Sequence, residues 1–163
     1  MTSETITVSE AMLEALQPME FTQGLAPQHL IKLASMAITK NFAEDEIIFR
    51  EGDESKLIYL VQEGLVALSI HVPGRDQITI LTVGPGKLLG WSSLFPPHQK
   101  TASARAVVPT RVIAINAPQV WQACQTDNAL GYSIMCRVAE VITGRLIATR
   151  LQLLDMFSPA SSQ

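Results

Sequence analysis

The chain has 163 residues, of which 47% are apolar, so it is long enough for one domain with its own core and too short for two of usual size. Its 12 lysines and arginines against 15 acidic residues give a formal charge of -3, which excludes a general electrostatic attraction to nucleic acid. The first twenty residues contain no basic segment and no apolar run approaches a membrane span, so we expect a cytoplasmic protein without a membrane anchor.

Two short helices are predicted at the N-terminus. Residues 8–17 begin near Ser9, which we expect to cap the first helix, and Pro18 ends that helix. Pro27 marks the first turn of a second helix. We expect residues 1–24 to form a helical lead-in and residues 25–157 to form the domain proper.

From about residue 40 to residue 116 the helical period gives way to short extended runs separated by glycine-rich turns. This pattern predicts about seven or eight strands and is typical of an all-β roll. The predicted strands are residues 47–49, 57–61, 65–70, 78–83, 88–89, 101–107 and 111–115.

A short helix capped by Asn116 is followed by a long helix at about residues 130–157, and residues 158–163 are expected to be disordered. The long helix would measure about 40 Å, which is more than a small roll needs for its own cover. It carries two apolar stripes. One is a heptad stripe of Tyr132, Met135, Ala139, Ile142, Leu146, Thr149, Leu153 and Met156, and the other contains Ile134, Val138, Val141, Ala148 and Leu151.

Two stripes predict two neighbours. We expect the roll on one side and the same helix of a second subunit on the other, which makes the protein a homodimer; the alternative is that both stripes are buried within one chain.

Several segments of the chain resemble the cyclic nucleotide-binding domain of Crp/Fnr regulators, the catabolite-activator type. They are the run F-x-x-D-E-I-I-F-R-E-G-D at residues 42–53, the run L-I-Y-L-V-x-E-G at 57–64, Gly86, Gly90 and the T-A-S run at 101–103. The resemblance covers about residues 25–157. It implies a mainly β fold with flanking helices: a double-stranded β-helix, or jelly roll, with a long C-terminal helix that often mediates dimerisation.

The resemblance also implies a phosphate-binding cassette at residues 90–103. In the family, a short helical turn directs backbone amides at a cyclic phosphate, a glutamate takes the ribose hydroxyl, and an arginine precedes a small hydroxylated run. In this chain Gly90 matches the family glycine, and Ser92, Ser93 and Leu94 occupy the helical turn.

Two positions depart from that pattern. Trp91 stands where the glutamate is expected, and an indole donates one hydrogen bond but accepts none. Lys100 replaces the arginine, and it can balance a phosphate only as a point charge. Thr101 and Ser103 alternate along the predicted strand and should direct their hydroxyls to one face, with Ser103 the better candidate for a phosphate oxygen.

These substitutions put binding of cyclic AMP itself in doubt and leave open another anionic ligand that stacks on Trp91. The candidate ligand is therefore a cyclic nucleotide of the cAMP or cGMP kind or a related phosphate compound. Thr143 and Thr149 on the long helix are candidate base contacts, although Thr149 could also set the helix register.

Four functions compete. The first is a dimeric regulatory module whose long helix shifts when the cassette is filled, and the second is a degenerate, ligand-free scaffold or dimerisation protein. A DNA-binding regulator would need a helix-turn-helix after the long helix, and only six residues follow Phe157, so we expect no direct DNA binding and action through a protein partner, unless the chain is a fragment.

A metal-dependent roll enzyme is the fourth possibility. It would need clustered histidines, but His29, His71 and His98 fall on a helix, a strand end and a loop. No spacing indicates a catalytic triad or a Cys-His pair either. We therefore expect no catalytic residues, no metal site and no enzymatic activity.

Overall fold

The computed structural model describes residues 8–158, and its N-terminal part consists of three short helical segments. They are α1 (Glu10–Leu16), the 3₁₀ turn η1 (Glu20–Thr22) and α2 (Pro27–Ala34). Ser9 stands at the N-cap of α1, but its side chain makes no capping hydrogen bond, so the capping role predicted for it is wrong. Apart from Ser158, the tail predicted to be disordered lies outside the described residues.

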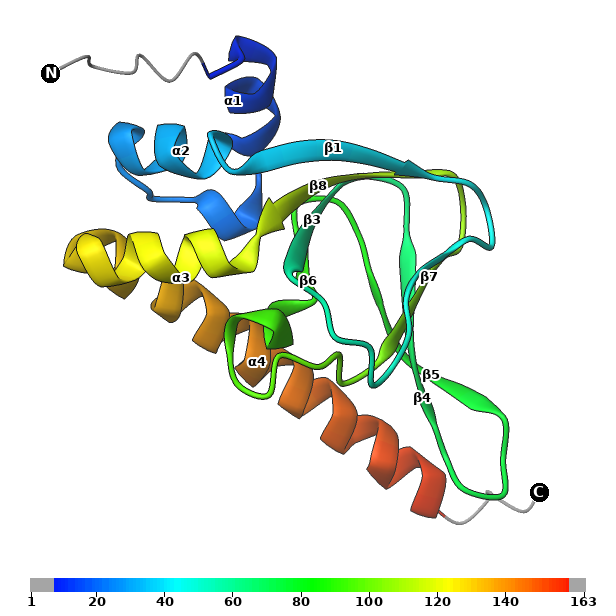
Figure 1. The fold of residues 1–163 in the computed structure, drawn as a ribbon. Helices are drawn as coiled ribbons and strands as arrows, with labels where there is room; N and C mark the ends of the chain where they lie inside the picture. Colours follow the sequence, from blue (N-terminus) through cyan, green and yellow to red (C-terminus); the bar gives the residue numbers. More distant parts are fainter. Residues whose placement is uncertain (1–7, 159–163) are drawn as a thin grey trace, which may run out of the picture.

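Eight strands follow and form two four-stranded antiparallel sheets, which confirms the predicted jelly roll (Figure 1). One sheet has the order β1-β8-β3-β6 and the other has the order β2-β7-β4-β5. The strands are β1 (Ala37–Phe42), β2 (Ile47–Phe49), β3 (Leu57–Glu63), β4 (Val66–His71), β5 (Gln77–Val83), β6 (Leu88–Leu89), β7 (Ser103–Ala106) and β8 (Thr110–Asn116).

Two strands differ from the sequence-based prediction. β1 was not among the predicted strands; it pairs with β8 from Ala37 opposite Ile115 to Phe42 opposite Thr110, so the roll begins before residue 40. None of the residues of β1 is fully buried, so its sequence does not need the alternation of apolar and polar residues by which strands are predicted. β7 is shorter than predicted, because Thr101 and Ala102 form a bend before the strand begins at Ser103.

The core has two parts, because β3 and β8 bury both of their faces. Tyr59, Val61 and Val112 point into the roll. On the opposite face, Leu60 and Ile113 pack against the helices, in a cluster that also contains Leu16, Leu33, Leu130, Ile134 and Val138. Side chains alternate across a strand, so neighbouring residues of one strand serve both clusters.

Side-chain caps define the two C-terminal helices, α3 (Ala117–Thr126) and α4 (Asn128–Phe157). Asn116 caps α3 as predicted, accepting a hydrogen bond from the amide of Gln119 at 3.0 Å. Asp127 caps α4 by accepting from the amide of Leu130, and it lies 3.1 Å from the Nε2 of His29 on α2. None of the helices in residues 8–158 combines the length and apolarity needed to cross a membrane.

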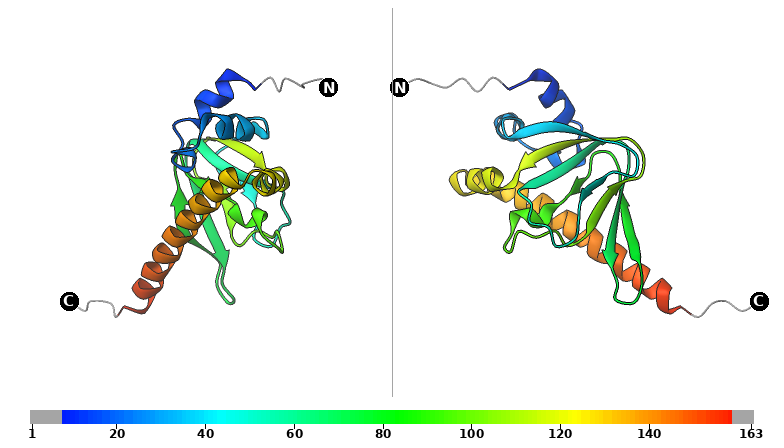
Figure 2. Two further views of the ribbon diagram at one scale, coloured as in Figure 1. Left: turned by 90° about the vertical axis from the view of Figure 1, so that its left-hand side faces the viewer. Right: turned by 45° about the vertical axis from the view of Figure 1, so that its right-hand side comes forward.

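α4 crosses the roll diagonally and its last turns extend beyond it (Figure 2). Its predicted heptad stripe is largely uncovered: Tyr132 is 76% exposed, Leu146 50% and Leu153 54%. Leu151 belongs to the second predicted stripe but is 59% exposed, so the stripe does not pack against the roll as far as this residue. Gln152 contacts the roll instead by donating to the carbonyl of Thr79 on β5.

Candidate ligand-binding site

The predicted cassette begins with Gly90, which follows β6 and has a φ of 76°. Such a backbone conformation favours glycine. A Cβ at this position would also lie 2.6 Å from the Nζ of Lys100. The chain then forms η2, a 3₁₀ turn from Trp91 to Leu94, in which the amide of Ser93 donates to the carbonyl of Gly90. Gly90 thus allows the turn and the lysine to pack against each other.

Lys100 is buried beneath this turn, with only 2% of its surface exposed. Its Nζ donates to the carbonyl of Leu57 at 2.8 Å, to the carbonyl of Gly90 at 3.0 Å and to the Oγ of Ser93 at 2.7 Å. The ammonium also lies 4.6 Å from the ring centroid of Phe49, a cation–π distance. All its partners are neutral, and burial lowers the pKa of Lys100 to about 8.

Arg145 reaches the same region from α4. Its guanidinium donates to the carbonyl of Leu88 on β6, which is its one protein acceptor within residues 8–158. No carboxylate of the described chain pairs with it. Burial lowers the pKa of Arg145 to about 10, so it remains charged at neutral pH.

Lys100 and Arg145 line one small cavity of about 20 Å³, together with Phe49, Leu68, Gly90, Trp91, Ser92, Thr101 and Ala102. None of these lining residues is acidic. The cavity therefore concentrates two positive charges and has no counter-charge of its own. Its volume is near that needed for a single water molecule.

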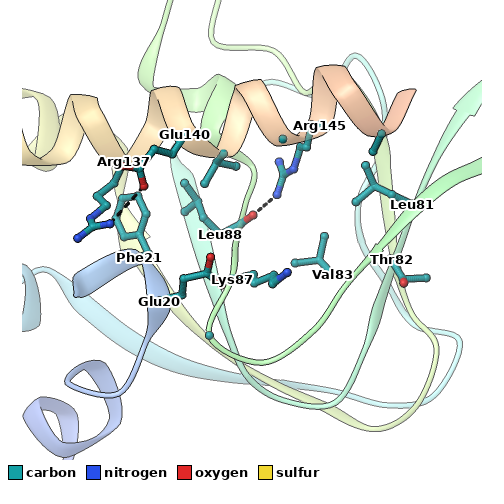
Figure 3. Close-up of a pocket in the computed structure, with 14 residues that line it drawn as sticks. Glu20, Phe21, Leu81, Thr82, Val83, Lys87, Leu88, Arg137, Glu140 and Arg145 are labelled. Carbon is teal, nitrogen blue, oxygen red and sulfur yellow. Dashed lines mark hydrogen bonds and ion pairs between the residues drawn. The ribbon is translucent and has the colours of Figure 1, made fainter. Parts of the chain in front are cut away.

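A larger cavity of about 340 Å³ lies between α4, β5 and η1 (Figure 3). Apolar side chains that include Phe21, Leu88 and Val141 line part of it. Arg145 lines this cavity as well as the smaller one, so its side chain stands between the two. Figure 3 shows Glu140 beside Arg137, with which it pairs at 3.2 Å, and Glu20 next to Lys87.

The structure brings five of the eight predicted cassette residues to the small cavity: Gly90, Trp91, Ser92, Lys100 and Thr101. The ring of Trp91 lies 6.4 Å from that of Phe95. Ser93 instead lies behind the turn, where its hydroxyl accepts from Lys100. Leu94 is buried in the core between the roll and the helices.

Three predicted contacts lie away from the small cavity. The Oγ of Ser103 accepts from the amide of Glu51, and Ser103 lines a depression with Arg50, His71 and Arg105 rather than the cassette cavity. Thr143 and Thr149 are exposed, and each hydroxyl donates to the carbonyl four residues earlier in α4.

Arg145 is the site residue that the sequence reasoning missed, although a signal for it was present. The stripe of Ile134, Val138, Val141 and Ala148 steps by 4, 3 and 7 residues, and the gap in the last step falls on residue 145. A cation at a position that continues an apolar, inward-facing stripe is an indication of a functional or paired charge.

Three comparisons with known proteins agree with this geometry. Residues 39–127 match the family model described as cyclic nucleotide-binding domain. The chain is similar to the cyclic AMP receptor protein of Thermus thermophilus, with 34% identity over 93 residues that cover 56% of this chain and 43% of that protein. It is also similar to a CRP-like cAMP-activated global transcriptional regulator of Mycobacterium tuberculosis, with 24% identity over 82% of this chain and 58% of that protein.

The chain thus spans about half the length of these two relatives. Among solved structures, a cyclic nucleotide-binding domain from Methylobacillus flagellatus superposes with a TM-score of 0.78 at 21% identity, covering 94% of this chain and 86% of that one. At this level of identity the likeness concerns the fold.

Proposed function

Because the chain belongs to the cyclic nucleotide-binding domain family, we propose that it is a regulatory module that binds a cyclic nucleotide or another small phosphate-bearing ligand beside Lys100. The observation that carries this proposal is the pair of cations, buried Lys100 and half-buried Arg145, on one cavity without an acidic residue. A buried charge without a counter-charge costs several kcal/mol, so a bound anion would offset a large cost at Lys100 and a smaller one at half-buried Arg145.

Ligand binding requires the site to open. The small cavity of about 20 Å³ is far below the roughly 300–1,000 Å³ of ordinary ligand pockets. Arg145 separates it from the larger cavity, so a turn of this side chain towards a bound phosphate would join the two. The rest of the ligand would then lie against the apolar side chains of the larger cavity, such as Phe21 and Val141.

This opening links the ligand to α4, because Arg145 belongs to that helix. A ligand that recruits the guanidinium breaks its hydrogen bond to Leu88 and favours another placement of α4 by population shift. The exposed stripe with Leu146 and Leu153 is the surface through which two subunits would pair and pass on the change.

The alternative is a ligand-free scaffold on the same fold, and one observation favours it. The three hydrogens of the Lys100 ammonium already meet three protein oxygens, so the lysine could serve only to hold the cassette turn in place. Calorimetric titrations with cyclic AMP, cyclic GMP, a cyclic dinucleotide and a nucleoside monophosphate distinguish the two functions. Heat with any of them, lost in Arg145→Gln and kept in Arg150→Gln, supports the regulatory module. No heat with any of them supports the scaffold.

A further inference from the structure

The polar groups around the small cavity are almost entirely hydrogen-bond donors. A lysine ammonium has three donors and no acceptor, an arginine guanidinium has five donors and no acceptor, and an indole has one donor. Arg145 and Trp91 therefore supply donors, Lys100 supplies its charge because its three hydrogens already meet protein oxygens, and only the hydroxyls of Ser92 and Thr101 can also accept. The side chains suit a ligand group that consists of acceptor oxygens.

The charged side chains around the small cavity are both positive. A cyclic nucleotide carries one negative charge on its phosphodiester, whereas the cavity carries two positive charges, on Lys100 and Arg145. A phosphate monoester carries about 1.5 to 2 negative charges at pH 7 and three terminal acceptor oxygens. It would neutralise both cations, while a diester would leave about one positive charge without a counter-charge.

The lining also lacks a partner for sugar hydroxyls. Trp91 stands where the family resemblance leads us to expect a glutamate, and no carboxylate lines the small cavity. Of the two acids that line the larger cavity, Glu140 pairs with Arg137 and Glu20 lies next to Lys87 (Figure 3). A ribose hydroxyl held close to Lys100 would find no carboxylate there.

We propose that the preferred ligand of this site is a dianionic phosphate monoester rather than a cyclic phosphodiester. The inference rests on the proposed function, because it assumes that the cassette binds an anion at all. It narrows that function to a ligand class through charge and hydrogen-bond matching. Arg145 is then the residue that sets the preference, since it supplies the second positive charge and its guanidinium has donors to spare.

The preference should depend on pH in a defined way. Below about pH 6 a phosphate monoester becomes a monoanion, so its advantage over a diester disappears. On the alkaline side Lys100 loses its proton above about pH 8 in the ligand-free protein. The other ionisable groups that face Lys100 are Arg145, which stays charged, and Tyr59, whose phenol burial keeps neutral by raising its pKa. The monoester should therefore be favoured most between these limits.

A matched pair of probes tests the inference by isothermal titration calorimetry at pH 7.5 and fixed ionic strength. Adenosine 3′-monophosphate and adenosine 3′,5′-cyclic monophosphate share base and sugar and differ in the phosphate ester. We expect the monophosphate to bind about tenfold more tightly or better, as expected for one additional charged hydrogen-bonded contact. Two controls separate the phosphate contribution to binding from that of the nucleoside. Inorganic phosphate should compete with the monophosphate, and adenosine should not bind.

Variants locate the source of the preference. Arg145→Gln should reduce the monophosphate preference to near unity, whereas Arg150→Gln, an exposed change on the same helix, should keep it. Thermal melts of both variants establish that they fold. Equal or tighter binding of the cyclic nucleotide overturns the inference and leaves the proposed function standing. Absence of binding by every phosphate compound overturns both.

Discussion

Replacing Lys100 with methionine isolates the free-energy cost of its buried charge. Methionine has a similar length and can stay between Phe49 and the cassette turn, but it cannot be charged. At neutral pH the variant loses three hydrogen bonds and also loses the desolvation penalty, so the net sign of its stability change is not diagnostic. The dependence of that change on pH is diagnostic.

The magnitude follows from the pKa of Lys100, which burial lowers from 10.5 to about 8. As pH rises above 8 the folded protein gives up this proton while the unfolded chain keeps it, so the unfolded state binds more protons. The free energy of unfolding of the wild type must therefore rise with pH relative to that of Lys100→Met. Between pH 7 and pH 9.5 the relative gain is about 2 kcal/mol.

Urea unfolding of both proteins at pH 7, 8, 9 and 9.5 measures this difference, and Lys32→Met, an exposed lysine of α2, is the control that should show no trend. In thermal melts a gain of about 2 kcal/mol corresponds to roughly 4–8 °C for a domain of this size. A wild-type-to-variant difference that stays constant across the range would refute the reasoning, because it would mean that the Lys100 ammonium keeps its ordinary pKa in the folded protein.

Three further changes test other parts of the structure. Gly90→Ala should destabilise the fold by roughly 2–4 kcal/mol in urea unfolding, because alanine disfavours the positive φ and its Cβ meets the Lys100 ammonium; unchanged stability would contradict the described turn. Gly144→Ala should raise the melting temperature by stabilising α4 by up to about 1 kcal/mol, since a Cβ there meets no atom within 4 Å, and a lower melting temperature would count against this. The double change Leu146→Glu and Leu153→Glu should convert a dimer into a monomer in light scattering without altering the melt of the roll, and a wild-type monomer would exclude the proposed seam.

Most of the roll could be predicted from its sequence because its turns carry strong local signals. Glycine-rich breaks marked the ends of β3, β4 and β5, and alternating apolar residues marked the strands themselves. β1 carried neither kind of signal. It pairs with β8 in the same sheet, and none of its residues is fully buried. Its pairing with β8, whose residues lie 68 to 78 positions further along the chain, makes it a strand.

The site was less predictable, because its arrangement depends on contacts between distant segments. Family resemblance pointed to Gly90, Trp91, Ser92, Lys100 and Thr101, which the fold does bring together. Strand parity for Ser103, however, was counted from Thr101, and the bend at residues 101–102 breaks that count. The predicted common face of Thr101 and Ser103 is consequently wrong.

Arg145 connects the candidate ligand site to the second half of α4. The first half of α4 is held by apolar packing of Ile134 and Val138. The second half contacts the roll through hydrogen bonds of Arg145 and Gln152, and a cavity lies beside it. Apolar packing in a filled core resists small shifts, whereas a hydrogen bond can be exchanged for another one at little net cost. An anion that offers Arg145 better acceptors than the carbonyl of Leu88 would therefore act on the half of the helix that is easiest to move. That half also carries Leu146 and Leu153, so the same residue that would sense the ligand lies beside the surface that would transmit the signal.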